Sequence, residues 1–144
     1  KRLTNLMNQY KFNDLSVGME EKFKATIEPF KMANFLEISN DINPLHLNSK
    51  YAKEKGFEDR VVYGLLTASF YSTLVGVYLP GKYCILQGID VQFFLPVYEN
   101  DTLVISGEIS YISEAYKQIE IKAKIINQDS KKVSSAIIKT GVLE

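Results

Sequence analysis

Residues 64–78 read GLLTASFYSTLVGVY and form the strongest predicted helix in the chain. Apolar side chains occur nearly all round it, so the helix is expected to be buried rather than to lie on the surface. Gly76 is less favourable in a helix than Ala by about 1 kcal/mol, although it allows close packing. The Pro80-Gly81 pair then ends the helix.

A strand and two short helices are expected before this central helix. The segment 21–27 alternates apolar and polar residues, as a half-buried strand does. Residues 29–38 start with a proline and then repeat apolar residues at roughly helical spacing. Residues 39–48 are predicted to form a polar loop. A second short helix is predicted over 49–55, where Gly56 stops it.

Four strand candidates follow the central helix, namely residues 83–95, 102–112, 116–127 and 132–143. The polar turns between them are short, which favours antiparallel neighbours. Helices in the first half and strands in the second indicate an α+β fold rather than alternating βαβ units. The sequence therefore predicts a single domain over residues 1–144, in which a curved antiparallel sheet packs its concave face against the buried helix.

The composition argues against several classes of function. The formal net charge is zero and the sequence pI is about 6.8, so no basic surface for nucleic acid is expected. Lys50, Lys53 and Lys55 form a short basic cluster, which fits either a solvated helix face or a seat for the phosphates of coenzyme A.

Cysteine usage and hydropathy bear on the compartment. Cys84 is the single cysteine, so no intrachain disulfide forms, and its strand context predicts a packing role. No uninterrupted apolar stretch reaches the ~18–20 residues of a membrane span, and the polar start lacks the apolar core of a signal peptide. We therefore expect a cytoplasmic protein with no membrane partner.

Reactive side chains concentrate in one place, residues 35–46, which read FLEISNDINPLH. His46 is the sole histidine, and imidazole is the natural proton carrier near neutral pH. Asp41 lies five residues earlier, with the turn-forming pair Asn43-Pro44 between them. A carboxylate and an imidazole that converge on one water form a competent acid/base pair. The alternative is an ordinary turn in which Asp41 bonds only its own backbone.

Other reaction chemistries find less support in the sequence. One histidine and scattered acids do not make a recognisable metal-ligand set, and no Gly-x-Ser-x-Gly elbow supports a serine nucleophile. The triplet Val62-Tyr63-Gly64 precedes the central helix. A glycine at this point leaves backbone N–H groups open to a developing oxyanion, although it equally suits a simple N-terminal cap.

The segment 39–46, SNDINPLH, followed after five residues by Ala52, resembles the hydratase signature of the MaoC-like family, which includes the (R)-specific enoyl-CoA hydratases. The likeness continues through three further segments and covers most of residues 15–143 in the same order. Those segments are Gly64-Leu65-Leu66-x-Ala68-Ser69, Leu79-Pro80-Gly81, and Phe94-Leu95-Pro96-Val97 with Asp101 after it.

The resemblance implies a hot-dog fold, in which an antiparallel sheet wraps the central helix, and a homodimer or higher homo-oligomer whose sheets join edge to edge. It implies reversible hydration of trans-2-enoyl thioesters, carried by coenzyme A or an acyl carrier, without a metal or redox cofactor. The implied roles are catalysis for Asp41 and His46, a backbone oxyanion donor at Gly64, a positioning role for Asn43, and an acyl-pocket position for Ser69.

Two positions depart from the family pattern. Asn40 replaces the usual glycine, and Asn tolerates the left-handed conformation better than most residues. Tyr63 stands where a histidine commonly precedes the glycine, so it is expected to narrow the pocket or alter contacts to the thioester. A hot-dog thioesterase and a non-catalytic acyl-thioester binder stay open as alternatives.

Overall fold

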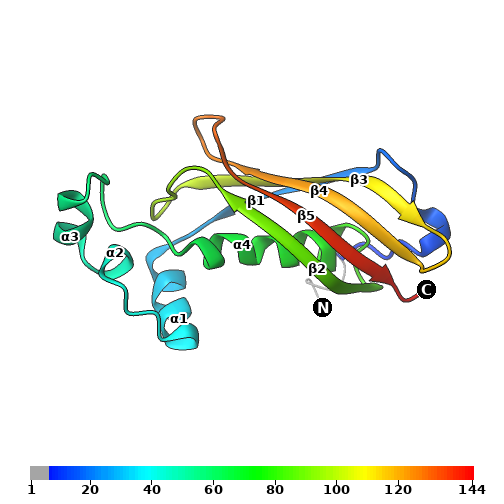
Figure 1. Cartoon of the computed structure of the whole chain (residues 1–144), viewed down its shortest axis with the longest axis horizontal. Helices are drawn as coiled ribbons and strands as arrows, with labels where there is room; N and C mark the ends of the chain where they lie inside the picture. The colour runs from blue at the N-terminus through cyan, green and yellow to red at the C-terminus, as the bar shows by residue number, and fades with distance from the viewer. Residues whose placement is uncertain (1–6) are drawn as a thin grey trace.

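The computed structural model describes residues 7–144, so the first six residues of the predicted domain lie outside the described range. Figure 1 shows a sheet with a helix along one face and further helices beyond its end. The elements are η1 (Phe12–Asp14), β1 (Glu20–Thr26), α1 (Pro29–Ser39), α2 (Pro44–Leu47), α3 (Ser49–Glu54), α4 (Gly64–Thr73), η2 (Leu74–Tyr78), β2 (Cys84–Phe93), β3 (Thr102–Ser113), β4 (Gln118–Ile126) and β5 (Lys132–Val142).

The five strands form one antiparallel sheet in the order β1-β3-β4-β5-β2. The predicted α+β class and antiparallel sheet are confirmed. The expectation that β2 and β3 would be neighbours is wrong, because β2 pairs with β5 at the far edge of the sheet. Residues 94–101 connect these strands, and they contact the start of α4 through the bond from Val62 N–H to Val97 O, 2.8 Å.

The core lies between the sheet and the central helix. Alternate residues of β3, β4 and β5 face this side, and Ile105, Ile121 and Ile138 are each fully buried. Gly107 lets the helix approach the sheet, since a Cβ there would stand 2.8 Å from Leu74 Cδ2 and 2.9 Å from Ile121 Cγ2. The central helix therefore meets the sheet at a position that only glycine fits without a shift.

The central helix is less uniform than its apolar sequence predicts. It is α-helical to Thr73 and ends in a π-helical turn over Leu74–Tyr78. Burial on all sides is wrong for the single chain, because Leu65 is 69% exposed and Ser69 and Ser72 are exposed as well. One side of the helix packs on the sheet while the other is open in the isolated chain.

Helices α1, α2 and α3 form an arm beyond the end of the sheet (Figure 1). The predicted helices over 29–38 and 49–55 are present within one residue of their expected ends. The predicted loop over 39–48 contains the one-turn helix α2, which the short polar sequence did not indicate. Within residues 7–144, no helix combines the length and apolar character needed to cross a bilayer.

Candidate active site

The loop that carries Asp41 starts at a left-handed residue. α1 ends at Ser39, and Asn40 follows with φ 55°. The Asn40 N–H donates to Leu36 O at 2.8 Å, which closes the helix. The expectation that Asn40 accepts the left-handed turn is confirmed, and the turn directs the chain out of α1 toward α2.

Asp41 and Asn43 build the start of α2 through their side chains. Asp41 Oδ1 accepts from Asn43 N–H at 3.1 Å, and Asn43 Oδ1 accepts from Leu45 N–H at 2.9 Å. Pro44 occupies the first helical position, where its missing N–H costs nothing. The local turn bond considered for Asp41 is therefore present, but it uses only one of the two carboxylate oxygens.

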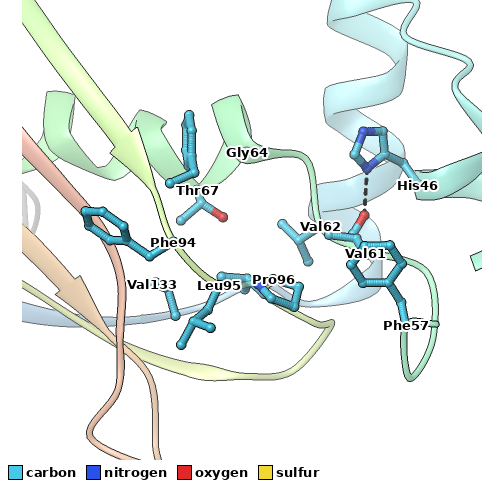
Figure 2. A pocket seen from close by; sticks show the side chains of 12 residues that line it. His46, Phe57, Val61, Val62, Gly64, Thr67, Phe94, Leu95, Pro96 and Val133 are labelled. Carbon is cyan, nitrogen blue, oxygen red and sulfur yellow. Dashed lines mark hydrogen bonds between the residues drawn. The ribbon is translucent and has the colours of Figure 1, made fainter. Parts of the chain in front are cut away.

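His46 is held by a backbone carbonyl outside its own helix. Its Nδ1 lies 2.7 Å from Val61 O, as the dashed line in Figure 2 marks. A carbonyl only accepts, so Nδ1 carries the hydrogen and Nε2 of the neutral ring keeps a lone pair. Val61 N–H in turn donates to Leu45 O at 3.0 Å. Both backbone groups of Val61 thus bond α2, which fixes the imidazole and its tautomer.

Tyr63 contacts both Asp41 and His46. It is 2% exposed, and its hydroxyl donates to Asp41 O at 2.8 Å. Its ring centroid stands 4.2 Å from that of His46, at an interplanar angle of 31°. Burial, and secondly the charge of Asp41, raise the pKa of the Tyr63 phenol, so the hydroxyl stays protonated as a donor.

A cavity of about 280 Å³ opens between the start of α4 and residues 93–97. Its wall is largely apolar, with His46, Thr67 and the backbone at Gly64 as the polar contributions (Figure 2). A Cβ at Gly64 would lie 3.2 Å from the Phe93 ring, so a larger residue would crowd this wall. The full lining is His46, Phe57, Val61, Val62, Gly64, Thr67, Phe93, Phe94, Leu95, Pro96, Val97 and Val133.

The structure brings two of the predicted site residues onto this cavity, His46 and Gly64. Asp41 and Asn43 lie on the exposed loop beside it and do not line it in the single chain. Ser69 is also outside the lining; it is exposed, and its hydroxyl donates to Leu66 O at 2.6 Å. Tyr63 contacts Asp41 and His46 rather than the cavity wall.

Thr67 is a site residue that the sequence analysis missed. It is 2% exposed, it lines the cavity, and its hydroxyl has no hydrogen-bond partner among the described residues. A threonine three positions after Gly64 on an apolar helix was the available signal, because residues i and i+3 share a helix face. An unpartnered buried hydroxyl is costly unless a ligand or water bonds it.

Metal ligands do not gather in the described part of the chain. Within residues 7–144, no group of three or more His, Cys, Asp or Glu side chains is placed to hold an ion. Cys84 packs at the edge of the core, where its thiol donates to Thr140 Oγ1 at 3.6 Å and burial raises its pKa.

Comparison with known proteins gives concordant matches. The profile of the family described as "MaoC like domain" matches residues 13–131. The (R)-specific enoyl-CoA hydratase of Aeromonas caviae is 33% identical over 114 residues, which are 79% of this chain and 85% of that enzyme. The 3-hydroxybutyryl-CoA dehydratase of Methylorubrum extorquens is 33% identical over 99 residues, 69% of this chain and 63% of that protein.

Solved structures agree on the architecture. The R-hydratase of Pseudomonas aeruginosa, in its unliganded form, superposes with a TM-score of 0.88 at 25% identity, covering 94% of this chain and 87% of that one. The (R)-hydratase from A. caviae involved in PHA biosynthesis gives a TM-score of 0.84 at 30% identity, covering 89% and 97%. The predicted hot-dog fold is confirmed, and the chain belongs to the MaoC-like dehydratase family.

Proposed function

We propose that this protein adds water reversibly to trans-2-enoyl thioesters of coenzyme A and forms (R)-3-hydroxyacyl thioesters. The observation that carries the proposal is the placement of His46, whose tautomer is fixed by Val61 O, on the wall of a cavity that begins at Gly64. Relatives at 33% identity are named as an (R)-specific enoyl-CoA hydratase and a 3-hydroxybutyryl-CoA dehydratase, which supports the same chemistry here.

The oxyanion donor in this proposal is the first backbone N–H of α4. The thioester carbonyl oxygen accepts from Gly64 N–H, where the helix dipole also favours negative charge. Polarising this carbonyl makes C3 electrophilic and stabilises the enolate-like transition state. The apolar wall formed by Phe93, Phe94 and Leu95 suits the hydrocarbon part of the acyl group.

His46 and Asp41 share the proton transfers. Nε2 of His46 takes one proton from water as the water oxygen bonds to C3, and the Asp41 carboxyl delivers a proton to C2. The imidazolium then returns its proton to the Asp41 carboxylate, so atoms and charges balance over the cycle. Asn43 supports this step because its side chain caps α2, which carries His46, and its N–H donates to Asp41 Oδ1.

The reaction as proposed needs no metal ion and no redox cofactor, since the carbonyl is polarised by a backbone N–H. A chelator is therefore expected to leave the rate unchanged. The proposal keeps the cytoplasmic location expected from the sequence, which cell fractionation would test.

A homodimer is part of the proposal, with strand β2 as the joining edge. Among residues 7–144, β2 pairs with β5 alone. Strand β2 and the segment after it expose large apolar side chains, between 42% and 51% each. Exposed edges of this kind are normally covered, because they otherwise pair with other chains. A second copy of the chain, related by a two-fold axis, would cover these apolar side chains. They belong to Ile85, Leu86, Ile89, Phe93, Phe94 and Leu95.

The test of the reaction follows the enoyl-thioester absorbance of crotonyl-CoA with the wild-type protein and Asp41→Asn side by side. Loss of absorbance with the wild type alone, together with (R)-3-hydroxybutyryl-CoA, is the expected result. Release of free thiol from saturated acyl-CoA would instead indicate a thioesterase. Saturable binding of enoyl-CoA chains of every length without turnover would contradict the enzyme and favour the non-catalytic binder.

A further inference from the structure

We propose that Tyr63 is the positioning residue of the catalytic pair, because one buried side chain contacts both Asp41 and His46 and joins them to the start of α4. This inference rests on the proposed hydratase function. It differs from the pocket-narrowing role expected from the sequence, since the Tyr63 ring does not line the cavity.

The contact to Asp41 is a hydrogen bond to its backbone. The Tyr63 hydroxyl donates to Asp41 O at 2.8 Å across 22 residues of sequence. Asp41 lies on an exposed loop whose other bonds, to Ser39 and Asn43, are local to that loop. Among the hydrogen bonds of the described residues, the Tyr63 hydroxyl is therefore the one that connects the Asp41 backbone to a distant part of the chain.

The contact to His46 is made by the ring. The two ring centroids are 4.2 Å apart with an interplanar angle of 31°, and Phe35 packs on Tyr63 from α1 at 4.8 Å. The imidazole is thus limited by the Tyr63 ring and by the bond to Val61 O. Two restraints of different kinds leave the ring little freedom to turn.

The third link runs to the oxyanion donor. Tyr63 is the N-cap of α4, its own carbonyl accepts from Thr67 N–H at 3.1 Å, and Gly64 follows it directly. Asp41 and His46 therefore both contact Tyr63, and the oxyanion donor Gly64 is its neighbour in the chain. Tyr63 itself is 2% exposed. Proton transfer between well-placed groups is sensitive to displacement, and about 1 Å of misplacement can cost 10²-fold in rate.

The test compares Tyr63→Phe with Tyr71→Phe in the full chain, using crotonyl-CoA. Tyr71 is the matched control because it is 1% exposed on the same helix, donates from its hydroxyl to Ser134 Oγ at 2.9 Å, and does not line the cavity. Both variants lose one buried phenol hydrogen bond. We expect kcat to fall on the order of tenfold in Tyr63→Phe alone, with KM nearly unchanged, and Tm to fall similarly in both.

A second readout needs no turnover. His46 is the sole histidine, so its imidazole protons are uniquely resolved in NMR spectra of tag-free protein. The ring of Tyr63 should shift them, and the shift should persist in Tyr63→Phe and disappear in Tyr63→Leu. Equal kcat in Tyr63→Phe and Tyr71→Phe, or a raised KM at constant kcat, would overturn the positioning role. Absence of turnover by the wild type with enoyl-CoA chains of every length would refute the proposed function itself, while the ring-current shift would still report the contact.

Discussion

The sheet and the arm are stabilised in different ways. On the inner face of the sheet, Ile109, Ile119 and Ile125 are fully buried, and full burial of such a side chain contributes about 1.5–3 kcal/mol. In the arm, residues 29–54, the buried side chains are Met32 and Ala52. The arm carries Asp41 and His46, so the proposed reacting groups lie on a part of the chain with little apolar burial.

The arm is instead held by directional bonds to specific partners. They run from His46 Nδ1 to Val61 O, from Val61 N–H to Leu45 O, and from the Tyr63 hydroxyl to Asp41 O. A neutral hydrogen bond stabilises a protein by a net of about 0.5–1.5 kcal/mol, so these bonds add modestly to global stability while they fix geometry. Most of the stability of the chain and the geometry of its proposed site therefore depend on different parts of the molecule.

The largest expected effect comes from the proposed catalytic pair, Asp41 and His46. His46→Ala and Asp41→Asn should each lower kcat for crotonyl-CoA by about 10²–10⁴-fold, the usual contribution of a general acid or base. Both residues lie outside the core, so Tm should stay near the wild-type value. Steady-state kinetics and calorimetry test this together, and near-full activity in both variants would refute the assignment of the pair.

A change in the sheet should show the opposite pattern. Gly107→Ala forces a methyl group against Leu74 and Ile121, and overpacking of this kind costs about 1–3 kcal/mol. Urea denaturation should show that loss, while kcat per folded molecule stays unchanged. Gly76→Ala is the control, because a Cβ at Gly76 meets nothing within 4 Å. Equal stability of the two variants would contradict the close approach of helix and sheet.

Helix caps separate the two roles within the arm. Asn43 caps α2, which carries His46, and Asn48 caps α3 by accepting from Tyr51 N–H at 2.9 Å. Replacement of either by Ala removes a cap worth about 1 kcal/mol. We expect Asn43→Ala to lower kcat by about tenfold through displacement of His46, and Asn48→Ala to leave kcat unchanged. Equal kinetics would show that Asn43 has no positioning role.

The sheet and the motif could be predicted from the sequence because both signals are local. Alternating residues in 116–127 define a strand by themselves, and the turn chemistry of Asn43-Pro44 marks the site before any tertiary contact is known. The left-handed turn at Asn40 was predictable for the same reason. Each of these signals depends on residues within one element or one turn.

The parts that could not be predicted depend on contacts distant in sequence. The placement of β2 beside β5 reflects a connection that crosses the sheet, which the length of residues 94–101 does not reveal. The contacts of Tyr63 and Thr67 appear only in the folded chain, from the bond of the Tyr63 hydroxyl to Asp41 O and from the cavity beside α4 that Thr67 lines. The exposed side of α4, with Leu65 and Ser69, likewise depends on what covers it rather than on its own apolar sequence.

The smallest expected effect concerns Thr67. This residue belongs to α4, which packs on the sheet, and it lines the same cavity as His46 of the arm. Its buried hydroxyl lacks a partner among residues 7–144, so Thr67→Val should stabilise the unliganded protein by about 1 kcal/mol in urea denaturation. Thr140→Val is the control and should be destabilised, because the buried Thr140 hydroxyl donates to Gly141 O at 2.8 Å.

If a bound acyl thioester or its water uses the Thr67 hydroxyl, KM for crotonyl-CoA should rise severalfold in Thr67→Val alone. A gain in stability with unchanged KM would mean that the hydroxyl faces the cavity without contacting the substrate, whereas a loss of stability would mean that it already has a partner in the folded chain.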